Sequence, residues 1–106
     1  MLYEFRPFRY NGSTGGGSVY TVYVVDDEPL VLSQFEKNIR WEDIPFQLAG
    51  MSTDPVAACQ RIMEMKPDVV LTDISMPVMS GLVLIRTLKE RGLKALFVVI
   101  SAYDRF

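Results

Sequence analysis

The sequence contains no histidine and a single cysteine among its 106 residues. The absence of histidine excludes Ser-His and Cys-His catalytic pairs, and it excludes zinc sites built on imidazole. One cysteine cannot form an intrachain disulfide, which fits a reducing, cytoplasmic location. Because Cys59 lies in an apolar helical repeat, we interpret it as a buried hydrophobic side chain rather than a reactive thiol.

Long hydrophobic runs and excess positive charge are also missing. No apolar stretch approaches the roughly 18 residues of a membrane span, and the N-terminus has no secretory-signal pattern. A net charge of −2 argues against direct nucleic-acid binding, which requires a basic face. Hydrophobic residues make up 49% of the chain, enough for the core of one small domain.

Composition divides the chain into residues 1–18 and residues 19–106. The sequence NGSTGGGS at 11–18 is typical of a flexible linker. A glycine-rich phosphate loop would follow a strand, open a helix and carry Gly-Lys-Ser/Thr, whereas these glycines precede a predicted strand. We therefore predict an N-terminal strand-like segment with a linker, followed by a folded domain over 19–106.

Residues 19–100 alternate between strand and helix patterns. Apolar, β-branched runs predict strands at 21–25, 46–50, 69–72 and 96–100. Helical periodicity and Pro, Ser-Gly and Gly boundary signals predict helices at 29–40, 55–65 and from 81 to about 91, with 31, 35 and 39 as the apolar face of the first. Strands joined by helices of this length favour right-handed βαβ units and a doubly wound α/β domain with a parallel sheet.

Four polar residues follow these predicted strands directly: Asp26 and Asp27, Asp73, and Ser101. The carboxyl ends of parallel strands meet at one edge of a sheet, where ligands bind. Three carboxylates and a hydroxyl at that edge indicate a hard metal ion and phosphate chemistry. Alternatively, the aspartates cap the first helix and a turn, which would explain one or two of them but not the whole set.

The residues at these strand ends resemble the receiver domain of two-component response regulators. The matching pieces are VVDDEP at 24–29, LTDISMP at 71–77 with Gly81 following, and ISAYD at 100–104. Trp41-Glu42-Asp43 with Phe46 is similar to receivers attached to AraC-type DNA-binding domains. The resemblance covers residues 20 to 106 and implies a flavodoxin-like fold.

The resemblance also implies a function, which is phosphorelay signalling rather than enzymatic turnover. Asp73 would accept a phosphoryl group from a histidine kinase, and Ser101 would be the switch hydroxyl. Mg²⁺ would be held by Asp26, Asp27, Asp73 and the backbone carbonyl of Ser75. The DNA-binding output domain would belong to a longer parent protein that controls transcription, with no direct nucleic-acid or membrane contact by this chain.

The sequence departs from the family after its fourth strand. A complete receiver has five strands and five helices, and its fifth strand leads to a phosphate-binding lysine. Residues 2–8 are similar to that fifth strand, with Arg6 at the lysine position and Tyr3 at the aromatic switch position, although Glu4 stands where the family is apolar and Arg is not equivalent to Lys. Either a shortened receiver has its fifth strand moved to the N-terminus, or these residues are an unstructured leader or cloning remnant.

Three further expectations follow from the departures. An under-covered sheet predicts a homodimer or a strand-swapped assembly. An engineered or truncated fragment would keep the fold and have little phosphotransfer activity. An Asp-nucleophile, Mg²⁺-dependent phosphatase would carry a second acid two residues after Asp73, where this chain has Ser75.

Overall fold

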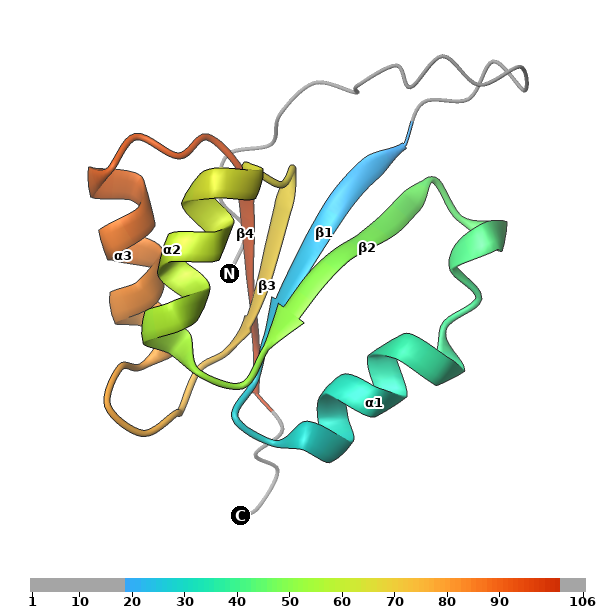
Figure 1. The fold of residues 1–106 in the computed structure, drawn as a ribbon, viewed down its shortest axis with the longest axis horizontal. Coiled ribbons are helices and arrows are strands. Elements are labelled where there is room, and N and C mark those ends of the chain that lie inside the picture. Colours follow the sequence, from blue (N-terminus) through green and yellow to red (C-terminus); the bar gives the residue numbers. More distant parts are fainter. Residues whose placement is uncertain (1–18, 102–106) are drawn as a thin grey trace.

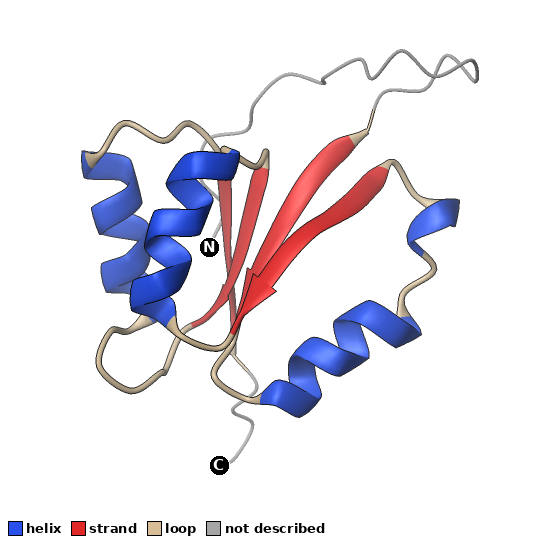
Figure 2. Cartoon of the chain, in the orientation of Figure 1, coloured by secondary structure: helices blue, strands red, loops and turns tan. Residues whose placement is uncertain are grey.

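A computed structural model describes residues 19–101 of the chain. Its elements are, in order, β1 (Tyr20–Val25), α1 (Pro29–Asn38), the 3-10 helix η1 (Trp41–Asp43), β2 (Phe46–Ser52), α2 (Pro55–Met65), β3 (Val69–Asp73), α3 (Gly81–Glu90) and β4 (Leu96–Ile100). The strands form one parallel sheet (Figure 2), and their order across it is β2-β1-β3-β4 (Figure 1). Helices α2 and α3 lie on one side of the sheet and α1 on the other (Figure 1), which confirms the doubly wound α/β prediction.

The two faces of the sheet carry separate apolar clusters. In β1, Val22 and Val24 point to the α1 side, whereas Tyr23 and Val25 point to the α2 and α3 side. This alternation follows from the two-residue period of a strand. The cluster under α2 and α3 is the larger, and its helical members are Ala58, Cys59, Ile62, Leu84, Ile85 and Leu88. Cys59 is therefore the buried hydrophobic side chain that the sequence predicted.

Helix α2 begins and ends at the predicted signals. The Asp54 carboxylate accepts a hydrogen bond from the Val56 N–H at 3.0 Å, and Pro55 occupies the first helical position. Lys66 ends the helix in the left-handed conformation, with φ of 49°. Met65, the last residue of this helix, is 38% exposed.

Helix α3 is closed at both ends by local hydrogen bonds. The Ser80 hydroxyl accepts from the Val83 N–H at 3.2 Å. At the other end Gly92 has φ of 90°, its N–H donates to the Lys89 carbonyl at 2.9 Å, and the Leu93 N–H donates to the Leu88 carbonyl at 3.0 Å. This pair of bonds is the Schellman arrangement, which favours glycine at its left-handed position.

The predicted apolar face of α1 is wrong in detail. Leu32 is the buried residue of this helix, and Phe35 is partly buried and packs against the same apolar cluster as predicted. Val31 is partly exposed, and Ile39 lies just beyond the helix end. A row of every fourth residue drifts about 40° per step around a helix of 3.6 residues per turn, so it cannot face the sheet throughout. Trp41 closes the end of α1, because its indole N–H donates to the Phe35 carbonyl at 2.9 Å.

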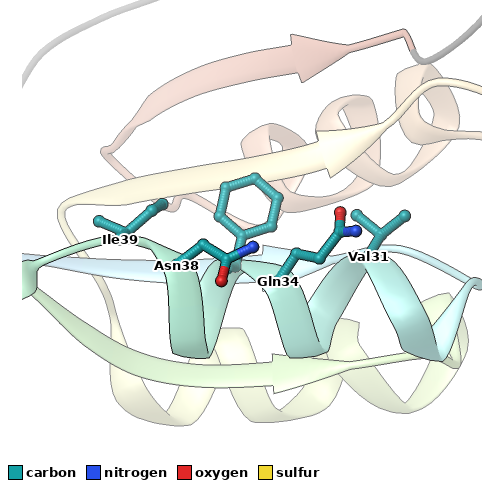
Figure 3. A pocket seen from close by; sticks show the side chains of 5 residues that line it. Val31, Gln34, Asn38 and Ile39 are labelled. Carbon is teal, nitrogen blue, oxygen red and sulfur yellow. The ribbon is translucent and has the colours of Figure 1, made fainter.

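A hollow of about 300 Å³ lies along α1 (Figure 3). It is lined by apolar and amide side chains: Val31, Gln34, Phe35, Asn38 and Ile39. None of these groups titrates, so the hollow offers no acid, base or charged metal ligand. Helix α1 is the one α-helix on this face among residues 19–101, and the dimer or strand-swapped assembly stays a prediction.

Strand β2 is longer than predicted and reaches Ser52. Its register with β1 shifts between Val22 and Tyr23, and Tyr23 then pairs with Gly50. A side chain at position 50 would place its Cβ 2.7 Å from the Tyr23 ring, so any residue other than glycine would force this buried ring to shift. Beyond this irregularity the pairing continues to Val25 with Ser52, which extends the strand beyond Gly50.

Part of the predicted architecture lies outside the described residues. This applies to the proposed fifth strand and linker at residues 1–18, and therefore to Tyr3 and Arg6. Among residues 19–101, no helix has the length and apolar character needed to cross a membrane.

Candidate functional site

Three aspartates from two neighbouring strands meet at the carboxyl edge of the sheet. Asp26 and Asp27 follow β1 directly, and Asp73 is the last residue of β3. One carboxylate oxygen from each lies within 4.8 Å of the others. Asp26 is only 4% exposed, whereas Asp27 and Asp73 are partly exposed, so the cluster has a buried side and an open side. We call these three residues the acid cluster.

Asp26 is held in place by its own turn and by β2. Its N–H donates to the Ser52 carbonyl at 3.1 Å, and its carboxylate accepts from the Glu28 N–H at 2.9 Å. The N-cap of α1 is Glu28, without a side-chain hydrogen bond, so neither Asp26 nor Asp27 caps this helix. The capping alternative therefore fails for these two residues.

Asp73 is positioned by β4 and by the start of α3. It pairs in register with Ile100, and the next N–H, of Ile74, donates to the Ile100 carbonyl at 3.1 Å. Gly81 donates its N–H to the Ile74 carbonyl at 2.9 Å, and a Cβ at Gly81 would lie 2.1 Å from the Asp73 carbonyl oxygen. Gly81 thus both begins α3 and permits close backbone approach.

Ser75 and Ser101 lie at the same edge of the sheet. Ser75 is exposed in the loop after β3, and Ser101 directly follows Ile100, the partner of Asp73. Their positions are compatible with a metal-binding carbonyl and a switch hydroxyl. Both roles stay predictions.

Another buried carboxylate, Asp68, belongs to the opposite edge of the sheet. It accepts hydrogen bonds from the Thr21 N–H at 2.9 Å and the Thr21 hydroxyl at 3.2 Å. Its own carbonyl accepts from the Leu96 N–H at 2.9 Å. Asp68 therefore ties the starts of β1, β3 and β4 together and plays no part in the acid cluster. Only its place before a strand, rather than after one, distinguishes it in the sequence.

Burial and mutual repulsion make the ionised carboxylates of the acid cluster unfavourable in the folded protein. Burial is the main cause that raises the pKa of Asp26. The hydrogen bond from the Glu28 N–H lowers this pKa, whereas the charges of Asp73, Asp27 and Glu28 raise it further. Two carboxylates about 4 Å apart repel by about 4 kcal/mol at an effective dielectric constant near 20. Oxygen donors at this spacing fit a hard divalent cation such as Mg²⁺, which would offset the repulsion.

The raised pKa of Asp26 predicts a pH-dependent stability in the absence of metal. The folded state holds the Asp26 proton to higher pH than the unfolded chain does, so the stabilisation is complete below the unfolded pKa, about 4, and is lost as pH rises through the folded pKa. We expect Asp26→Asn, which keeps the acceptor for the Glu28 N–H, to remove this part of the pH dependence. At neutral pH it should stabilise the metal-free protein, because it removes a buried charge.

Urea unfolding with EDTA at several pH values measures this effect. The difference between Asp26→Asn and the original chain cancels the contributions of the carboxylates that lie far from the acid cluster. Identical pH slopes for the two proteins would show that the Asp26 charge is not destabilising.

Comparison with known proteins agrees with this geometry. A family model, described as the response regulator receiver domain, matches residues 22–105. The chain belongs to the response regulator receiver family. The described residues of this receiver form four parallel strands in the order β2-β1-β3-β4. As a receiver, it is a signalling module rather than a conventional enzyme.

Three relatives show the range of this similarity. The receiver is 31% identical to the uncharacterized transcriptional regulatory protein YesN of Bacillus subtilis, over 83% of this chain and 24% of YesN. It is 28% identical to the DNA-binding transcriptional activator EvgA of Escherichia coli, over 74% of this chain and 38% of EvgA. A solved two-component transcriptional regulator AraC from Clostridium phytofermentans matches with a TM-score of 0.71 and 28% identity, over 80% of this chain and 68% of that one. The receiver thus spans about a quarter of YesN, and the predicted likeness to AraC-type regulators is confirmed.

Proposed function

We propose that this receiver accepts a phosphoryl group on Asp73 from a histidine kinase, in a reaction that depends on Mg²⁺. The observation that carries the proposal is the acid cluster, with oxygens from Asp26, Asp27 and Asp73 within 4.8 Å of one another at the carboxyl edge of a parallel sheet. Family membership and the partly exposed position of Asp73 support the choice of nucleophile.

The proposed chemistry needs only a carboxylate nucleophile and charge neutralisation. An Asp73 carboxylate oxygen attacks phosphorus, an O–P bond forms, and the P–N bond to the donor imidazole breaks. The imidazole keeps the electron pair and takes up a proton. Asp26, Asp27, Asp73 and the Ser75 carbonyl would hold Mg²⁺, which supplies the positive charge that screens the incoming phosphoryl group from the acid cluster.

Asp26 is suited to metal binding because its carboxylate is already oriented. The backbone N–H of Glu28 donates a hydrogen bond of 2.9 Å to one Asp26 carboxylate oxygen. The donor belongs to the backbone and not to a mobile side chain, so this oxygen is held in a fixed position. Asp27 and Asp73 lie on the more open side of the cluster, where a phosphoryl group can enter. The site thus combines a fixed, buried ligand with an accessible nucleophile.

The partners follow from the surroundings of the site and from the relatives. Leu30, 75% exposed, and Leu82, 46% exposed, lie in the first turns of α1 and α3 at the same sheet edge. Apolar side chains beside an anionic site favour a protein as the phosphodonor. The relatives named as transcriptional regulators support a DNA-binding output domain in a longer parent protein, with Ser101 carrying the signal from Asp73.

Incubation with MgCl₂ and acetyl phosphate tests the proposal. We expect an intact-mass increase of about 80 Da, as for one phosphoryl group, and no increase with EDTA. Continuous phosphate release from p-nitrophenyl phosphate without an adduct would instead favour the phosphatase, which the absence of an acid at Ser75 disfavours. Neither adduct nor release would identify the chain as an inactive fragment that keeps the receiver fold.

A further inference from the structure

The loop between β3 and α3 contains a backbone conformation that is costly for the residue that adopts it. Val78 has φ of 73°, a left-handed value that is rare for a β-branched residue. The Met79 N–H donates to the Pro77 carbonyl at 2.7 Å, which closes a γ-turn centred on Val78. Turns of this kind with positive φ are rare and strained. The Val78 side chain is 92% exposed, so no core packing offsets the strain.

Both ends of this loop are anchored. At its start, the Ile74 N–H bonds to β4, and the Met76 side chain is buried in the core under α2 and α3. At its end, Ser80 caps α3. The ring of Pro77 fixes its own φ, so the change of direction needed to close the loop falls on Val78.

Lys66 offers a comparison within the same chain. It also has positive φ, 49°, but it ends α2, where its N–H donates to the Ile62 carbonyl at 2.7 Å. A left-handed residue is a common way to end a helix. Lys66 precedes β3, whereas Val78 follows it, so the two residues lie at opposite edges of the sheet.

We propose that Val78 is a positioning residue for the metal and phosphoacceptor site. A residue with a Cβ has few conformations at positive φ, so once the anchors force it there the loop has one closure. Ser75 lies in this loop, between the fixed Ile74 and Met76, and its carbonyl is the proposed metal ligand. That single closure therefore also restricts the orientation of the Ser75 carbonyl, which follows Asp73 by two residues in the sequence. This inference rests on the proposed function.

The variant Val78→Gly distinguishes the effect of position 78 on the stability of the fold from its effect on metal affinity. Glycine adopts positive φ without strain, so Val78→Gly should stabilise the fold. Glycine also allows other closures of the loop, so the Ser75 carbonyl should be less well placed for the metal. Stability and metal affinity are expected to change in opposite directions.

The experiment compares the original chain with Val78→Gly and with Lys66→Gly. Lys66→Gly is the matched control, because it also removes the strain of a positive φ but does so at the opposite edge of the sheet. We expect both variants to raise the thermal midpoint in EDTA by about 4 °C. Calorimetric titration with MgCl₂ should show an affinity loss of about ten-fold for Val78→Gly and less than about two-fold for Lys66→Gly. Val78→Ala keeps the Cβ and should bind Mg²⁺ within about two-fold of the original chain, because the backbone, not the isopropyl group, is the positioning element.

Three results would overturn the inference. The first is unchanged or tighter Mg²⁺ binding by Val78→Gly. The second is a loss of stability or of folding in Val78→Gly, which would show that position 78 is not strained. The third, no Mg²⁺ binding by the original chain, would overturn the proposed function as well, whereas the first two leave it intact.

Discussion

Asp73→Asn should abolish the phosphoryl adduct formed with acetyl phosphate and Mg²⁺. The amide is a poor nucleophile, so no O–P bond forms at this position. The substitution nearly conserves shape and removes one of three charges within 4.8 Å, so the fold should be retained or slightly stabilised in the absence of metal. Loss of the mass increase of about 80 Da is the expected result, together with weaker Mg²⁺ binding.

The matched control for this variant is Asp54→Asn. Asp54 is also an aspartate at the carboxyl edge of the sheet, but it caps α2 through the Val56 N–H and lies outside the acid cluster. Asparagine caps helices about as well as aspartate, so the control should remain stable and should still form the adduct. An adduct of equal yield in Asp73→Asn would show that a different group is the phosphoacceptor.

Gly81→Ala should be among the most destabilising single substitutions in the described part of the chain. The added Cβ would lie 2.1 Å from the Asp73 carbonyl oxygen, 3.0 Å from its carbonyl carbon and 3.2 Å from the Ile74 Cα. All three are backbone atoms, so no side chain can move to make room. Relief requires a shift of α3 away from β3, which would break the 2.9 Å bond from the Gly81 N–H to the Ile74 carbonyl. We expect a loss of at least about 3 kcal/mol in the free energy of unfolding.

Gly92→Ala is the control for Gly81→Ala. Gly92 has φ of 90°, but no atom lies within 4 Å of an added Cβ. The loss of stability in Gly92→Ala should therefore reflect backbone strain alone, about 1 kcal/mol. Urea unfolding measures both variants, and acetyl phosphate labelling measures the site in whatever fraction remains folded. Gly92→Ala should be phosphorylated normally, whereas folded Gly81→Ala should be labelled slowly, because Asp73 is displaced. Equal destabilisation by the two variants would contradict the steric argument.

Local signals in the sequence predicted most of the secondary structure. The strand at 96–100 was predicted with its observed bounds, and α2 and α3 begin at the predicted Pro55 and Gly81. These features depend on a residue and its near neighbours, through capping bonds, proline geometry and strand periodicity. The prediction was wrong where orientation decides the outcome, as in α1, whose buried residue is Leu32. Which side of a helix faces the sheet depends on how the side chains of the helix and those of the sheet pack together.

By itself the sequence determined the fold class, the family and the identity of the acidic residues. Parallel strands bring their carboxyl ends to one edge, so three aspartates directly after two strands must lie near one another. Only the tertiary structure decided how near they are, that Asp26 is buried, and that Gly81 lies against the Asp73 backbone. It also decided that Val78 adopts the strained conformation of the loop, because the start of that loop is held by the Ile74 N–H on β4 and by the buried Met76 side chain. Such distances depend on strand register and helix packing, which join residues far apart in the chain and leave no local pattern.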